Sequence, residues 1–279
     1  MINRTTFYTY ARRSPFGGRL SREQIAGMEA MFTAWDQHGD GDLRKLANGF
    51  AQCFHETGGR MVPVRETFAA STAQAIARLD AAWKAGRLGQ VSKPYWRDGW
   101  FGRGRLQTTH YDNYLYAHHK TGLDCVNNPD VLLTEEGDAK VFWPSLFQGW
   151  WTRGRHRLGM YFNATVDDPK GARRIVNGTD KASLIATYHK AFLDALNAAD
   201  EATPQPKDVT PEAATPDDVS PAESKPFWMT VLGWFTSLGL TFPNIDNAYG
   251  LIAFLAILTV GGIGAWAYFT GRLSLNRVQ

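Results

Sequence analysis

The residues best suited to chemistry are two glutamates, Glu56 and Glu66, which stand ten positions apart. Glu56 follows Phe54 and precedes the pair Gly58 and Gly59, which would let a ligand approach the backbone closely. Burial beside Phe54 would keep a carboxyl group protonated, as a general acid requires. Two carboxylates in one cleft are the apparatus of glycoside hydrolysis. A glutamate that merely ends a helix is the alternative, and this pattern alone leaves both open.

Metal chemistry is the other interpretation of this segment. The zinc pattern His-Glu-x-x-His needs a second histidine one helical turn after His55, where Gly59 stands instead. The acidic turn at residues 36–42 is similar to a calcium loop, but Ala47 occupies the position of its bidentate glutamate. We therefore expect neither a metal nor a cofactor.

Helices must position these glutamates. Ser21 and Gln24 form a capping-box pattern ahead of apolar residues at helical spacing, which predicts a helix that ends at Gly39. The same periodicity predicts helices over residues 43–56 and 72–84, from Thr134 onward, and from about Asp180 to Leu196. Pro144 should kink or divide the helix that begins at Thr134. Residues 86–114 should form loops and short extended pieces.

Four segments, in order, resemble the signatures of glycoside hydrolase family 19. They are His-Glu-Thr-Gly-Gly (55–59), Phe-Gly-Arg-Gly-Arg-Leu-Gln-Thr-Thr-His-Tyr-Asp-Asn-Tyr (101–114), Asn-Pro-Asp (128–130) and Arg-Ile-Val-Asn-Gly (174–178). The run Pro-Val-Arg-Glu-Thr (63–67) is similar to one in endolysin-type members from phages and prophages. The resemblance covers about residues 40–196. It implies a mainly α, lysozyme-like α+β fold with a two-lobed helical catalytic domain.

The resemblance also implies roles for individual residues. Glu56 takes the position of the general acid, Glu66 that of the base that activates water, and Thr109 that of a residue holding this water. The family inverts the anomeric configuration, so the two carboxylates should lie about 6.5–9.5 Å apart. Substrate contacts are expected at six positions: His55, Arg65, Gln107, Asn113, Tyr114 and Asn177.

This chain departs from the family pattern at several places, including Thr108, which replaces a leucine, and the absence of the disulfides of plant-type members. Arg105 stands where the family usually has proline, which should be harmless if the loop backbone is kept. After Asn177 and Gly178, plant-type members carry another glycine and an acidic residue, whereas this chain has Thr179, Asp180 and Lys181. The sequence therefore does not show whether this chain has the charge network that surrounds the catalytic base in plant-type members.

Charge and composition divide the chain into three parts. Residues 199–226 hold six of the 13 prolines, seven acidic residues and two lysines, which predicts a disordered, extended linker. Residues 227–279 carry a net charge of +1, so residues 1–198, the expected catalytic domain, carry +7. A basic domain suits a polyanionic partner such as a bacterial envelope polymer. Basic residues are not interleaved with aromatics, so we do not expect nucleic-acid binding.

The last part should meet a membrane. Residues 248–270 carry no charge and are long enough to span a bilayer as a helix, with aromatic residues near both ends. Residues 227–243 suit either an interfacial helix or a second span. No apolar segment follows Arg12 and Arg13, so we expect no cleavable signal peptide.

These features predict an endolysin-type hydrolase that cleaves β-1,4 bonds in peptidoglycan. It would sit at a host inner membrane or a virion membrane, with the catalytic domain acting on the periplasmic cell wall. Glycan strands would be its substrate, and a holin or another lysis or virion membrane protein could be its partner. The alternatives are a chitinase, a membrane-anchored structural protein that only binds glycan, and a holin-like membrane disruptor.

Overall fold

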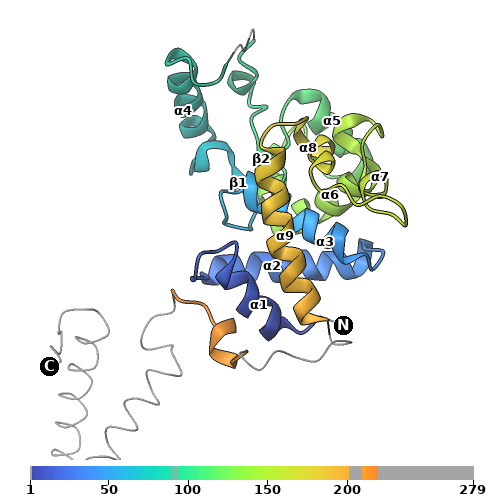
Figure 1. The fold of residues 1–279 in the computed structure, drawn as a ribbon. Coiled ribbons are helices and arrows are strands. Elements are labelled where there is room, and N and C mark those ends of the chain that lie inside the picture. The colour runs from blue at the N-terminus through green and yellow to red at the C-terminus, as the bar shows by residue number, and fades with distance from the viewer. Residues whose placement is uncertain (1, 90, 92, 201–208, 219–279) are drawn as a thin grey trace, which may run out of the picture. The chain divides into compact units, whose positions relative to one another are not determined.

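The computed structural model describes residues 2–89, 91, 93–200 and 209–218 of the chain, drawn as a coloured ribbon in Figure 1. The chain divides into two compact units, residues 1–217 and 218–279. Of the second unit only Asp218 is described, so the expected tail segments, residues 227–243 and 248–270, lie outside the described residues. None of the helices that the structure describes is long and apolar enough to cross a membrane.

The first unit is mainly helical, as expected, and four helices enclose its main core. They are α1 (Arg4–Arg13), α2 (Arg22–His38), α3 (Leu43–Glu56) and α9 (Ala182–Ala199). Each helix contributes one buried phenylalanine to a chain of rings. The centroid of Phe32 lies 4.9 Å from those of Phe7 and Phe50, and Phe50 lies 5.4 Å from Phe192, favourable separations for aromatic pairs. α9 therefore closes the core directly over α3, which it contacts along its length (Figure 1).

Local capping sets where the predicted helices begin. Ser21 and Gln24 form the expected reciprocal capping box at the start of α2. Side chains of Asp42, Ser71 and Thr134 cap α3, α4 (Thr72–Lys84) and α6 (Glu135–Gln148), each by accepting a backbone N–H of the first turn. These helices therefore begin where their sequence signals predict.

Pro144 was expected to kink or divide its helix, and division is wrong, because α6 continues through it to Gln148. A proline there removes one backbone hydrogen bond. Its neighbours Trp143, Ser145 and Leu146 are fully buried, so packing against the core holds this turn in place. α1 and α5 (Tyr111–Thr121) were not predicted. α5 begins inside the stretch that we expected to consist of loops.

A short antiparallel pair of strands, β1 (Val64–Arg65) and β2 (Arg103–Gly104), connects two loops of the site. Val64 pairs with Gly104, and Arg65 pairs with Arg103. The remaining short helices among the described residues are α7 (Leu158–Tyr161), α8 (Arg174–Asn177), and the 3-10 turns Glu66–Phe68, Tyr95–Asp98, Pro129–Leu133, Trp150–Thr152, Gly171–Arg173 and Pro211–Ala214.

Part of the expected linker is not extended. Residues 209–218 pack against α1, and Arg12 donates hydrogen bonds to the carbonyl oxygens of Ala213 and Thr215 and to the carboxylate of Asp217. The backbones of Leu20 and Asp217 also bond, with Asp217 N–H donating to the Leu20 oxygen over 2.7 Å. Specific bonds to one arginine thus order a stretch whose composition predicts disorder. The rest of the linker after Asp200 lies outside the described residues, apart from these ten.

Candidate active site

Glu56 is the last residue of α3, at the point where the chain turns away from the core. The buried hydroxyl of Thr57 donates to the Cys53 carbonyl (2.7 Å) and accepts the N–H of Met61 (3.0 Å), which fixes the turn. Gly58 has φ +59°, and a Cβ there would lie 2.8 Å from the ring of Phe68. This turn therefore needs glycine both for its backbone conformation and for space.

A buried arginine holds the Glu56 carboxylate. Arg173 Nη1 lies 2.5 Å from Glu56 Oε1 and 2.9 Å from Gln52 Oε1, and Arg173 Nε donates to the carbonyl oxygen of Asp180 over 3.0 Å. The Arg173 side chain is only 1% exposed and that of Glu56 is 14% exposed. Such a charge-assisted bond fixes the orientation of the carboxylate. Arg173 was not predicted from the sequence, where its only signal is its position directly before the segment 174–178.

Glu66 follows β1 directly, and the strand pair holds it. Its N–H donates to the Gly102 carbonyl (2.8 Å), and its Oε2 accepts the Gly102 N–H (2.6 Å). Burial raises the pKa of the Glu66 carboxyl, although the Gly102 N–H and the charge of Arg103 oppose this rise. The negative charge of Glu56 raises that pKa further, so the two carboxylates interact electrostatically.

Both glutamates line one cavity of about 490 Å³, a volume suited to a small-molecule or sugar ligand. Its wall also includes residues 106–110, Asn113 and Asn177, together with Tyr95, Trp151 and Val176. The structure thus brings together both expected catalytic carboxylates, Thr109, and three of the six expected substrate contacts. Tyr95, His110 and Trp151 are lining residues that sequence reasoning did not identify.

The loop after β2 owes its shape to Gln107. Its backbone has φ +53°, and its Nε2 donates to the carbonyl oxygens of Val64 and Gly104, each over 2.9 Å. A Cβ at Gly102 would lie 2.6 Å from Gln107 Oε1, so glycine is required opposite it. The amide nitrogen of Gln107 is therefore used to join the loop to the strands.

Thr109 follows on the same loop, and Asn113 lies in the first turn of α5. The Thr109 hydroxyl donates to the Gln107 carbonyl oxygen (2.7 Å), which leaves its own oxygen able to accept a hydrogen bond from water in the cavity. Asn113 Nδ2 donates to the Thr109 carbonyl (2.9 Å), and its Oδ1 accepts from Arg153 (3.1 Å). This network holds the loop in the shape that the cavity requires.

The other three expected substrate contacts do not line this cavity. Tyr114 is fully buried, and its hydroxyl donates to the Phe101 carbonyl (2.6 Å) and accepts from Arg103 (3.0 Å), so it supports the loop from inside. Arg65 forms an ion pair with Asp130 over 2.6 Å. His55 is half-buried on α3, and burial lowers its pKa.

Among the residues that the structure describes, no group of three or more His, Cys, Asp or Glu side chains is placed to hold a metal ion. The cavity is lined by two carboxylates, one bonded to an arginine and one with a raised pKa, and by the Thr109 hydroxyl.

Comparison with known families agrees with this geometry. The family model of class I chitinases matches residues 17–158, which include Glu56, Glu66 and the Gln107 loop. The chain belongs to glycoside hydrolase family 19. It is therefore a glycosidase, and its chemistry is hydrolysis of a glycosidic bond. No curated protein and no solved structure matches the chain. Arg173 and Asn177 lie beyond the matched residues but line or support the same cavity.

Proposed function

We propose that this family 19 enzyme cleaves β-1,4 bonds between the amino sugars of peptidoglycan, as an endolysin does. The observation that carries the proposal is that Glu56, Glu66 and Thr109 line the same cavity. The mainly helical first unit is compatible with the lysozyme-like fold that such enzymes use.

In the proposed mechanism, Glu56 protonates the oxygen of the leaving sugar while Arg173 keeps its carboxyl group oriented. Glu66 removes a proton from a water that also bonds to the Thr109 hydroxyl, and this water attacks the anomeric carbon from the opposite face. The bond between the anomeric carbon and the bridging oxygen breaks, and the product has inverted configuration. Burial raises the pKa of Glu66, which makes its carboxylate a stronger base toward this water.

The experiment compares purified full-length chain with Glu56→Gln and Glu66→Gln on isolated peptidoglycan. New reducing ends measure the rate, and mass spectrometry identifies the bond cut. Removing a general acid or base should lower kcat by about 10²–10⁴-fold. Glu136→Gln is the matched control, since that glutamate is 83% exposed and its one ion pair among the described residues is with Lys140. Equal rates for wild type and Glu56→Gln would refute the mechanism.

Chitin is the second candidate substrate, because the matching family model is that of class I chitinases. The sugars of both polymers are joined by β-1,4 bonds, so the same cavity residues could cleave either polymer. Chitin oligosaccharides assayed beside peptidoglycan decide between them: faster turnover of chitin oligosaccharides would make the chain a chitinase. Nuclear magnetic resonance of the first product anomer tests inversion on whichever substrate is cut.

We also propose that residues 248–270 anchor the enzyme to a host or virion membrane and that the catalytic domain acts on the periplasmic wall. The support is the uncharged length of that segment. Fractionation of cells that express the full chain, followed by protease treatment of intact cells, tests both parts. Recovery of the chain entirely in the aqueous fraction would refute the anchor. Leakage of dye-loaded liposomes with the full chain tests a holin-like role.

A further inference from the structure

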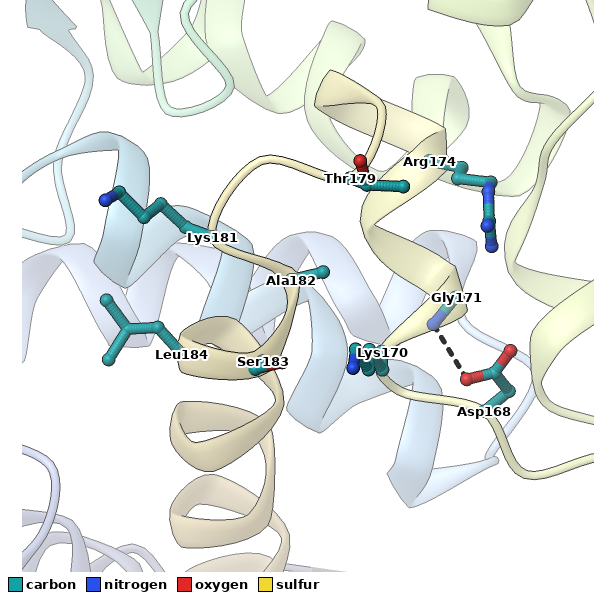
Figure 2. Close-up of a pocket in the computed structure, with 9 residues that line it drawn as sticks. All are labelled: Asp168, Lys170, Gly171, Arg174, Thr179, Lys181, Ala182, Ser183 and Leu184. Carbon is teal, nitrogen blue, oxygen red and sulfur yellow. Dashed lines mark hydrogen bonds between the residues drawn. The ribbon is translucent and has the colours of Figure 1, made fainter.

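A second hollow, whose lining includes the residue two positions after Asn177 of the active-site cavity, lies on the chain that leads from α7 into α9. Its volume is about 640 Å³, and three basic side chains line it: Lys170, Arg174 and Lys181. Its acidic residue is Asp168 (Figure 2). None of the three basic side chains forms an ion pair with another described residue, but Arg174 hydrogen-bonds to the side chain of Tyr161. Lys170 and Lys181 therefore carry the charge that is available to a ligand in the hollow.

Asp168 belongs to the frame of this hollow. Its Oδ1 accepts the N–H of Gly171 over 2.7 Å, as Figure 2 shows. A Cβ at Gly171 would lie 2.0 Å from Asp168 Oδ2, so the carboxylate fills the space beside this glycine. Asp168 thus shapes the turn before α8, and three cations against one carboxylate leave the hollow with a net positive charge.

The cations are spread along the hollow instead of converging on a point. In Figure 2, Lys181 and Arg174 extend to opposite sides, and Lys170 lies between them. The spacing suits an extended ligand that carries more than one negative group.

The hollow is physically connected to the catalytic acid. Arg173 bonds to the Glu56 carboxylate at one end and to the carbonyl oxygen of Asp180 at the other, and Lys181 follows Asp180. Asn177 lines the active-site cavity, whereas Thr179 lines the hollow. The charge of Lys181 also reaches His55, the neighbour of Glu56, since it helps to lower the pKa of His55 behind the larger effect of burial.

We infer that this hollow is a subsite for the carboxylate-bearing peptide stems of the glycan substrate. The inference rests on the proposed function, because a strand held at Glu56 would carry its side branches past residues 177–181. Peptide stems are extended and carry several carboxylates, which matches the separated cations. Chitin is uncharged and offers no such group. The subsite would therefore be the feature that favours peptidoglycan over chitin.

The test measures kinetics of the full-length chain and of Lys170→Gln, Lys181→Gln and the double variant. Lys190→Gln is the matched control, since it makes the same charge change on α9 at a side chain that is 75% exposed and that, within the part of the chain the structure describes, forms an ion pair with Asp194 alone. The substrates are intact peptidoglycan, peptidoglycan with amidated stem carboxylates, and glycan strands freed of peptide by an amidase. Thermal unfolding confirms that the variants are folded.

On intact peptidoglycan each exposed cation should contribute about 2–5-fold in KM, with kcat unchanged and the effect reduced in high salt. On amidated or peptide-free strands the variants should equal wild type. Equal KM values on intact peptidoglycan, or equal losses on all three substrates, would overturn the subsite. The subsite would also be overturned if the increase in KM persists on amidated peptidoglycan but disappears when phosphate groups are removed from the cell-wall preparation. That result would indicate a phosphate ligand. Wild-type chain that cuts none of these substrates would instead refute the proposed function.

Discussion

Replacing Arg105 with methionine should destabilise the enzyme severely, although family members usually have proline at this position. Arg105 is 2% exposed. Its Nη1 donates to Asp138 Oδ2 (2.7 Å), its Nε to the Met61 carbonyl (2.8 Å), and its own backbone N–H to Asp138 Oδ1 (2.8 Å). One side chain therefore joins the loop after β2 to α6 and to the segment that follows Glu56.

The size of the effect follows from burial. Arg105→Met leaves the Asp138 carboxylate, whose side chain is 5% exposed, without its cation. Breaking a buried ion pair from one side costs about 3–5 kcal/mol. A chain of this size loses roughly 2–4 °C in Tm per kcal/mol, so Tm should fall by about 10 °C. A second substitution, Asp138→Asn, removes the unpaired buried charge, and the asparagine oxygen can still accept the N–H of residue 105. The double variant should therefore regain most of the lost stability.

Thermal and urea unfolding, followed by circular dichroism, measure this double-mutant cycle. We expect a coupling energy above about 1 kcal/mol between the two positions. Glu135→Gln is the control. That side chain also contacts Arg105 (2.6 Å), but it is 51% exposed, so its loss should cost less than about 1 kcal/mol. Unchanged unfolding of Arg105→Met, or a cycle in which the two losses simply add, would refute the argument.

Three further predictions concern other parts of the first unit. Because burial raises the pKa of Glu66 above its ordinary value of 4.5 and the base must be ionised, the acid limb of kcat/KM should lie above pH 4.5; a limb at or below that pH would contradict the role of Glu66. Burial lowers the pKa of His189 to about 4 from an ordinary 6.5, so the unfolded chain binds the extra proton and stability is lost as pH falls through this window. That loss should be about 2 kcal/mol between pH 7 and pH 5, and urea titrations of His189→Phe should show a correspondingly flatter profile. Arg12→Ala should release residues 209–218 and expose them to limited proteolysis without changing kcat, whereas an unchanged digestion pattern would show that Arg12 does not hold them.

The sequence predicted best what local interactions decide. Caps such as Ser21 and Asp42 act within three residues, so the starts of α2 and α3 could be read directly. Glu66 was noticed as a second carboxylate ten residues after Glu56, but its role as the base and the importance of the Gln107 loop came from resemblance to a family, since no periodicity points to them. The bond between Arg173 and Glu56 joins residues 117 positions apart, and nothing local to either residue indicates it.

Composition gave a wrong prediction for part of the acidic, proline-rich stretch. Its low average hydropathy predicts an extended linker. An average over many residues cannot show that one of its carboxylates forms an ion pair with a particular arginine. Asp217 and Arg12 stand 205 positions apart in sequence, yet their contact orders residues 209–218 on α1. Likewise, Pro144 was expected to kink or divide its helix on intrinsic preference, whereas the burial of Trp143 and its neighbours holds α6 together.

The net charge of the first unit also has to be interpreted by position. Three arginines, Arg103, Arg105 and Arg173, are almost completely buried, and each pairs with a carboxylate of this chain. They cancel inside the protein and cannot attract an anionic polymer. The excess of +7 that the sequence predicts for residues 1–198 must therefore be carried by other side chains. Lys170, Arg174 and Lys181 are exposed, form no ion pair with a described residue and line a hollow joined to Glu56 through Arg173. An anionic wall polymer would thus be attracted to the neighbourhood of the catalytic acid, and raising the salt concentration should weaken its binding there more than it slows bond cleavage.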